Sequence, residues 1–363
     1  MVKKKVKSKA VKKTTRKKAV KNKKSPIVKK KVIKKPVKKI VKKKAKKTSK
    51  TKSKKLKFSP KVDDSIKNAD HLIELALKED LGKDLAKGDI TSIATIPKTK
   101  RVKAQIRVKE HCVLCGVDLA QKIIEVYEKL AKIKAKDKVK FEILMRDGAF
   151  LQKNEVAMKF EGPAITILTC ERTMLNIVSR LSGISTSTNR FVTKLIMHGV
   201  QLLDTRKTLG GYRELEKYAV RVGGGTNHRT GLYDMFLIKD NHVQIAGSIK
   251  KAMDAAIKKR GKKDTQIELE VESLKQVNEL LKLKKLPNIV MLDNLSYEEM
   301  EISVDRIRKK SKLAKKNIKI EASGGVTIEN ITEVAKCGVD MISVGSALTL
   351  GAKPVDFTLD IID

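Results

Sequence analysis

Residues 318–346 read IKIEASGGVTIENITEVAKCGVDMISVGS. A short apolar run ends at Ala322, a helical stretch covers 328–336, and a second apolar run ends at Val344. A glycine-containing turn follows each apolar run. This order of strand, helix and strand is typical of a parallel sheet, in which a helix connects neighbouring strands.

The same rhythm extends toward the N-terminus. Short apolar runs end at residues 203, 238, 270, 292, 322 and 344, at intervals of 35, 32, 22, 30 and 22 residues. Helical or loop-forming stretches lie between most of them, as at 249–259 and 274–283. We therefore predict a parallel β/α barrel over residues 172–345.

The segment before the barrel lacks this regular alternation. A helix is predicted from Ser65 to Gly82, a half-exposed strand over 102–108, a helix over 120–130 and further strands over 156–168. We predict a small domain of mixed helices and strands over residues 61–171. The C-terminal segment, 346–363, is expected to pack back on this domain.

Residues 1–60 form a lysine-rich tail. They hold 29 Lys, one Arg and no acidic residue, within a formal net charge of +42 for all 363 residues. Repulsion between like charges, with few apolar side chains to bury, predicts disorder. The tail could bind nucleic acid or an anionic surface, or it could be a solvated extension without a part in the chemistry. The near absence of aromatic residues among the lysines favours the second interpretation.

Cysteine use and hydropathy exclude several classes of protein. Four cysteines in 363 residues do not form a disulfide framework. No apolar run reaches the roughly 20 residues of a membrane span, and the N-terminus lacks the apolar segment of a signal peptide. We expect a cytoplasmic protein. Cys112 and Cys115 have the spacing of half a zinc site, but no second pair exists, so no metal is expected there.

Three polar clusters lie within one stretch that apolar runs flank: DTRKT at 204–208, GGGTNHR at 223–229 and KDNH at 239–242. Burying several cations near one another costs several kcal/mol each unless anions pair with them. The clusters therefore predict a pocket for a polyanion that carries carboxylates, phosphates or both. The cations concerned are Arg206, Lys207, His228, Arg229 and Lys239.

Glycine loops after the last two predicted strands indicate a phosphate site. Ser323-Gly324-Gly325 follows the run that ends at Ala322, and Gly345-Ser346 follows the run that ends at Val344. Glycines let backbone N–H groups approach an anion closely, and the loops after the final strands usually hold phosphate in β/α barrels.

Two carboxylates end consecutive predicted strands, Glu270 and Asp293. Beside a phosphate site, they are suited to hold Mg²⁺ on a diphosphate. The alternative is that either one pairs with a barrel lysine or arginine. His228 could donate to a carboxylate or could be a packed histidine, and Arg172 lies at the start of the helix that leads into the barrel.

These motifs resemble those of the quinolinate phosphoribosyltransferase family, whose members are also called nicotinate-nucleotide pyrophosphorylase (carboxylating). The resemblance runs from about Ile73 to the C-terminus and leaves the lysine tail outside. It rests on ordered matches at 79–82, 88–91, 171–176, 181–184, 204–208, 215–220, 223–229, 231–234, 237–242, 268–272, 291–294 and 321–326.

The resemblance implies a type II phosphoribosyltransferase fold, in which an N-terminal α/β sandwich precedes an incomplete parallel β/α barrel. It also implies a homodimer in which Arg172 reaches the partner's active site, the substrates quinolinate and phosphoribosyl pyrophosphate, and the cofactor Mg²⁺. By motif position, quinolinate and neighbouring phosphate would contact Thr205, Arg206, Lys207, His228, Arg229 and Lys239. Glu270 and Asp293 would serve the Mg²⁺–ribose diphosphate, and the 5-phosphate would lie on Ser323, Gly324, Gly325, Val344, Gly345 and Ser346. The catalytic residues would be Lys207, Lys239, Glu270 and Asp293.

The implied reaction joins the pyridine nitrogen to ribose C1, expels pyrophosphate and releases the 2-carboxylate as CO₂, giving nicotinate mononucleotide for NAD biosynthesis. Alternatives are a nicotinate phosphoribosyltransferase, a molybdenum-associated homologue, and an enzyme scaffold whose tail binds nucleic acid. Three positions depart from the family pattern, namely the loop 209–213 with its Gly210-Gly211 pair, Ser185 where alanine is frequent, and Leu350 where histidine is frequent.

Overall fold

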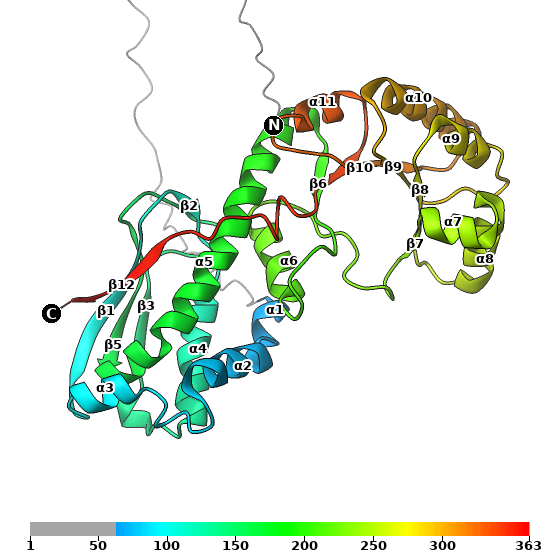
Figure 1. Ribbon diagram of the computed structural model, residues 1–363. Helices are drawn as coiled ribbons and strands as arrows, with labels where there is room; N and C mark the ends of the chain where they lie inside the picture. Colours follow the sequence, from blue (N-terminus) through cyan, green and yellow to red (C-terminus); the bar gives the residue numbers. More distant parts are fainter. Residues whose placement is uncertain (1–62, 363) are drawn as a thin grey trace, which may run out of the picture. The chain divides into compact units, whose positions relative to one another are not determined.

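The computed structural model of the chain describes residues 63–362, so the predicted tail lies outside the described residues. Twelve strands and eleven α-helices make up this part, together with two short 3₁₀ turns at Ala135–Asp137 and Ile196–His198 (Figure 1). In the described residues, no helix combines the length and apolar character that a membrane span needs.

The N-terminal domain is built on a four-stranded antiparallel sheet in the order β12-β1-β5-β3. Its strands are β1 (Arg101–Val108), β3 (Lys140–Ile143), β5 (Val156–Pro163) and β12 (Phe357–Ile362), and a two-stranded sheet joins β2 (Cys112–Val113) to β4 (Phe150–Leu151). The C-terminal segment therefore returns to this domain through β12, which pairs with β1 from Lys103 to Val108.

Helices complete the N-terminal domain: α1 (Asp64–Lys67), α2 (Asp70–Leu81), α3 (Ile90–Thr95) and α4 (Val117–Leu130). Apolar residues of α2 and α4 pack with those of β1 and β5 in one buried cluster. The single helix predicted from Ser65 to Gly82 is wrong in one respect, because the chain breaks at Asn68 and forms α1 and α2 separately. Gly82 ends α2 as predicted, with a positive φ that glycine adopts without strain.

Helix α5 (Ala164–Leu195) connects the two halves of the protein. Its first two thirds pack in the N-terminal core, whereas Phe191 and Leu195 pack in the barrel core. The expected boundary between residues 171 and 172 thus lies inside a continuous helix. Residues 164–168, which the sequence assigned to strands, are its first turns, and Arg172 lies in its third turn rather than at its start.

The barrel half is a six-stranded parallel sheet in the order β6-β11-β10-β9-β8-β7. Thr226 adds a parallel bridge to Leu203 beyond β6, and β7 leaves the opposite edge unpaired, so the barrel is incomplete. All six predicted strand ends are confirmed to within one residue. The strands are β6 (Gln201–Leu203), β7 (Phe236–Ile238), β8 (Ile267–Val271), β9 (Ile289–Asp293), β10 (Lys319–Ser323) and β11 (Met341–Ser343).

Five helices follow α6 (Arg213–Val222) in the barrel half: α7 (Asp240–Ala246), α8 (Ile249–Arg260), α9 (Leu274–Leu281), α10 (Tyr297–Leu313) and α11 (Ile331–Lys336). Helices α8 to α11 pack on the outer side of the sheet, and the C-terminal end of α5 joins the same core beside α11 (Figure 1).

Alternation along the strands directs carboxylates into the barrel. In β8, Ile267, Leu269 and Val271 pack in the outer core, so Glu268 and Glu270 face inward although every residue of the strand is buried. Ile320 and Ala322 of β10 likewise pack outward and leave Glu321 inside.

Candidate active site

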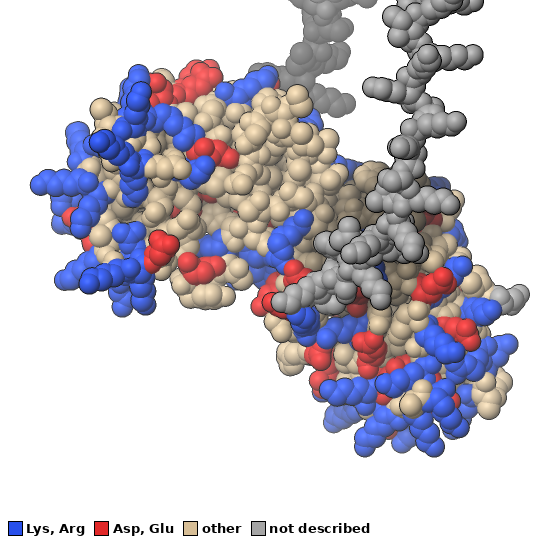
Figure 2. Space-filling model, turned by 180° about the vertical axis from the view of Figure 1, so that it is seen from behind, with Lys and Arg blue, Asp and Glu red and all other residues tan. Residues whose placement is uncertain are grey.

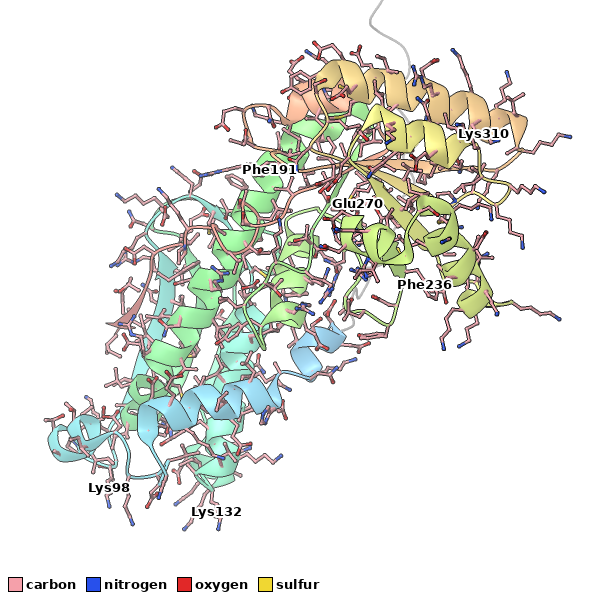
Figure 3. All side chains as sticks on the ribbon, turned by 45° about the vertical axis from the view of Figure 1, so that its right-hand side comes forward. Lys98, Lys132, Phe191, Phe236, Glu270 and Lys310 are labelled. Carbon is pink, nitrogen blue, oxygen red and sulfur yellow. The ribbon has the colours of Figure 1, made fainter. Side chains whose placement is uncertain are left out.

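The predicted site residues meet at one edge of the parallel sheet. Because all six strands run in the same direction, the loops after β6, β7, β8, β9, β10 and β11 emerge at the same end. Thr205 to Lys207 follow β6, Lys239 follows β7, and Glu270 and Asp293 lie at the ends of β8 and β9. Figure 3 places Glu270 near the middle of the barrel, far from Lys310 on the outer helix α10.

Surface charge alone does not locate this site. Lys and Arg side chains cover much of the face shown in Figure 2, on both halves of the protein. Partly buried cations are more informative because burial penalises an unpaired charge. Arg206 and Arg229 are such a pair. Burial lowers the pKa of Arg229, and the charge of Arg206 lowers that pKa further. Neither guanidinium forms an ion pair with any residue in the range 63–362.

A group of carboxylates occupies the ends of β7 and β8. Oxygens of Asp240, Glu270 and Glu272 lie within 4.8 Å of one another. Burial raises the pKa of Glu270, and Asp293 and Asp240 raise it further, whereas an ion pair with Lys239 opposes the shift. The alternative in which Glu270 pairs with a barrel lysine is thus present, with the Lys239 side chain 43% exposed.

The glycine loops after β10 and β11 are shaped by close contacts. Gly324 has a φ of +83°, and a side chain there would come within 2.3 Å of Asn294 Oδ1. Gly325 also has a positive φ, so two consecutive backbone units take a turn that glycine favours and that suits anion binding. Gly345 lies directly under the Lys207 side chain, where a Cβ would be 2.8 Å from Cδ.

Hydrogen bonds to backbone groups connect the loops of the site. The Thr349 hydroxyl donates to the Lys207 carbonyl at 2.5 Å, and the Lys207 N–H donates to the Thr205 hydroxyl at 3.0 Å. Val344 is buried and its N–H donates to the Leu203 carbonyl. Lys207 is therefore presented beside Gly345 and Ser346, next to the expected phosphate loop.

His228 lies on the inner wall of the barrel between two carboxylates that the sequence did not assign to the site. Its Nε2 is 3.2 Å from Glu268 Oε2 and 3.5 Å from Glu321 Oε2, and both carboxylates are fully buried. Burial raises the pKa of Glu268 to about 7, and the nearby Glu321 carboxylate adds to the shift. The signal for this cluster was a glutamate inside an apolar run in each of two predicted strands.

The protonation of His228 follows from its other nitrogen. The Arg229 N–H donates to His228 Nδ1 at 2.7 Å, so Nδ1 bears a lone pair and the ring hydrogen is on Nε2. The two glutamates raise the pKa of His228 to about 10, but a second ring proton would confront the Arg229 N–H. The bond to Nδ1 also opposes metal binding at Nε2, since a neutral metal-bound histidine carries its proton on Nδ1. The protonation of His228 therefore does not suit a metal at this cluster, and no oxygen of Glu268 or Glu321 has a hydrogen-bond partner among the described residues.

Arg172 is the one predicted site residue that the structure sets apart. It is exposed on α5, and no hydrogen bond or ion pair within the described range joins it to the other site residues. Asp204 and Lys217 are functional candidates that sequence reasoning left without a role, although both lie in the motifs that carry the resemblance.

The three departures from the family pattern have local explanations. The buried Ser185 hydroxyl donates to the Val113 carbonyl at 2.6 Å. The loop 209–213 is held by Arg213, whose guanidinium donates to Thr208 and to the Thr230 carbonyl. Leu350 is exposed and contributes no polar group.

Comparison with known proteins agrees with this geometry. The family models for the N-terminal and C-terminal domains of quinolinate phosphoribosyl transferase match residues 89–182 and 184–360. A probable nicotinate-nucleotide pyrophosphorylase (carboxylating) of Methanocaldococcus jannaschii is 42% identical over 293 residues, which cover 79% of this chain and 96% of that protein.

Solved structures of nicotinate-nucleotide pyrophosphorylases have a similar fold. The nicotinate-nucleotide pyrophosphorylase of Francisella tularensis is similar with a TM-score of 0.71 at 36% identity, covering 83% of this chain and 98% of that one. Human nicotinic acid phosphoribosyltransferase has a TM-score of 0.54 at 10% identity over 76% of this chain and 72% of its own, a likeness of fold alone.

Proposed function

The chain belongs to the quinolinate phosphoribosyltransferase family, and from this premise we propose that it transfers phosphoribose from phosphoribosyl pyrophosphate to quinolinate with loss of CO₂. The products are nicotinate mononucleotide and pyrophosphate. The enzyme is thus a pentosyltransferase of NAD biosynthesis. One observation carries the proposal for the acceptor: Arg206 and Arg229 lie close together and partly buried, and neither forms an ion pair among residues 63–362, although Glu268 and Asp234 lie near enough to act on the charge of Arg229.

A dicarboxylate would satisfy this pair of cations. A guanidinium binds a carboxylate through two parallel hydrogen bonds, and the two carboxylates of quinolinate supply one for each arginine. Nicotinate has a single carboxylate and would leave one partly buried guanidinium without an anion. The mutual repulsion of Arg206 and Arg229 therefore favours quinolinate over nicotinate as the acceptor.

The loops after β10 and β11 suit the phosphate end of the donor. Gly324 and Gly325 expose backbone N–H groups in a positive-φ turn, and Lys207 lies against Gly345. We assign the 5-phosphate to these loops and the diphosphate to the region between Lys207, Lys239 and the carboxylates.

The carboxylates of the site fit Mg²⁺. Asp240, Glu270 and Glu272 offer clustered oxygen ligands, and Asp293 faces Glu270 from the next strand. Bound there, Mg²⁺ would neutralise charge on the departing diphosphate. Lys239, which pairs with Glu270 and is half exposed, would turn toward a phosphate oxygen.

The reaction requires the protein mainly to bind the two substrates and to orient them. The pyridine nitrogen forms a bond to ribose C1 as the bond from C1 to the diphosphate oxygen breaks. Glu270 and Asp293 stabilise positive charge that develops at C1, and the arginines hold the ring in line. The positive charge of the ring nitrogen then stabilises the carbanion left at C2 as CO₂ departs, and C2 takes a proton from water. No strong general base is needed.

We also propose a homodimer that places Arg172 in the partner's site. Arg172 is exposed on α5, and three exposed apolar residues flank the unpaired edge strand β7, namely Leu232, Tyr233 and Ile245. A second copy that covers them would bury this apolar surface. Mixing an Arg172→Ala variant with a Glu270→Gln variant should then restore activity, because one site of each mixed dimer is intact. Exchanged subunits without recovered activity would contradict the arrangement.

A direct test supplies phosphoribosyl pyrophosphate with quinolinate labelled in its 2-carboxylate, or with nicotinate. We expect labelled CO₂ and nicotinate mononucleotide in equal amounts from quinolinate, and no product from nicotinate. Product from nicotinate alone would overturn the substrate assignment.

A further inference from the structure

Helix α6 carries two neighbouring buried charges that reach the two substrate-binding loops. Glu216 accepts a hydrogen bond from the Leu209 N–H in the loop after β6, at 3.3 Å. Lys217 points to the other loop and donates to the His228 carbonyl at 3.1 Å. These contacts connect the 215–220 motif, which the reaction itself does not use, to the cations of the site.

Asp204 completes the contact to the second loop. Its Oδ1 accepts from Lys217 Nζ at 2.6 Å and from the His228 N–H at 2.7 Å, and its Oδ2 accepts from Asn227 Nδ2 at 2.7 Å. Asp204 thus holds the N–H of His228 while Lys217 holds the carbonyl of the same residue. The two members of the ion pair therefore hydrogen-bond to both backbone polar groups of His228, its N–H and its carbonyl.

Stability alone gives little reason for such a pair. Asp204 is fully buried and Lys217 is 3% exposed, and a buried ion pair is often no more stabilising than apolar side chains of similar size. Its distinctive effect is geometric. With both peptide groups of His228 fixed, the direction of the His228 side chain and the start of Arg229 are fixed as well.

We propose that the Asp204–Lys217 ion pair is a positioning element for quinolinate binding, which clamps the backbone of His228 and so aims His228 and Arg229 at the acceptor. Neither residue of the pair touches the substrate. This inference rests on the proposed function. Donor phosphates are assigned to other loops, so the pair should govern the acceptor and not the donor.

The test compares a Lys217→Met variant with the parent enzyme and with Ile307→Ala, a core variant in α10. Ile307 is fully buried and lies in the barrel core away from the clamp, so its loss destabilises the protein without touching the 223–235 loop. We measure KM separately for quinolinate and phosphoribosyl pyrophosphate, and hydrogen exchange of the 223–235 peptide by mass spectrometry. An Asp204→Asn/Lys217→Met variant, which leaves no buried orphan charge, covers the case in which the single variant does not fold.

We expect either clamp variant to raise the KM for quinolinate by roughly tenfold to a hundredfold and to speed exchange in 223–235. The KM for phosphoribosyl pyrophosphate should stay close to that of the parent, and Ile307→Ala should change neither KM. Parent-like quinolinate KM and parent-like exchange in a folded clamp variant would refute the inference. If the parent does not turn over quinolinate, the proposed function fails, and the exchange measurement still decides whether the pair clamps the loop.

Discussion

Replacing Glu268 with glutamine should change how the stability of the protein depends on pH. Glu268 and Glu321 lie near each other and near His228 Nε2 inside the barrel, and both are fully buried without a hydrogen-bond partner among the described residues. Two unpaired buried carboxylates cannot both be ionised at low cost, which is why burial and Glu321 raise the pKa of Glu268 to about 7.

The sign of the effect follows from this raised pKa. In the unfolded chain Glu268 loses its proton near pH 4.5, whereas in the folded protein it keeps the proton up to about pH 7. The folded state therefore binds more protons between these values, and this contribution to stability is lost as pH rises through 7. The full difference corresponds to about 3 kcal/mol, of which about 2 kcal/mol develops between about pH 5.5 and pH 8.5.

Chemical denaturation of the parent and of Glu268→Gln at these two pH values measures the effect. Glutamine cannot titrate, so its free energy of unfolding minus that of the parent should rise by about 2 kcal/mol on going to the higher pH. Taking the difference removes the other titrating groups, provided that protein concentration is held constant. Glu279→Gln, an exposed change on α9, serves as the control. A difference between Glu268→Gln and the parent that does not vary with pH would refute the reasoning.

Three further changes test other parts of the site and fold. Arg229→Ala should lower kcat/KM for quinolinate by a factor that corresponds to about 2–5 kcal/mol of lost binding free energy, because a substrate carboxylate loses its partner. Turnover equal to that of the parent in steady-state kinetics would show that Arg229 does not bind the substrate carboxylate. Asp293→Asn should raise the Mg²⁺ concentration for half-maximal activity by about tenfold or more, and an unchanged Mg²⁺ titration would remove Asp293 from the metal site. Ser185→Ala should lower the free energy of unfolding by about 1 kcal/mol by removing the hydrogen bond to Val113, and a denaturation midpoint equal to that of the parent would show that this bond adds no stability.

The parallel barrel and the edge that carries its site were predictable from the chain alone. Apolar runs ended within one residue of the observed strands, because a strand buried on both faces needs a continuous apolar segment. The polar residues after those runs must then lie at one edge of the sheet, since parallel strands all end there. Gly324 and Gly345 could be assigned to the site for the same reason, because they lie in the loops that follow the last two strands.

Other features depended on contacts that no local pattern contains. The apolar spacing of residues 65–82 is the same for one helix as for two, so the break at Asn68 was not visible. The long helix α5 was hidden because residues 164–168, which form its first turns, read as a continuation of the strand that ends at Pro163. Arg172 consequently lies well inside a helix that packs in both cores.

The sequence by itself determined the kind of site, namely partly buried arginines, paired acids and glycine loops at the mouth of a parallel barrel, because residue type and strand order are local properties. Only the tertiary structure decided which charges meet. Asp204 and Lys217 are thirteen residues apart, and Glu268 and Glu321 lie on strands separated by β9. Their pairing depends on how the sheet curves and on how α6 packs against α5. Burial makes these pairings important, because an unpaired charge removed from water is costly.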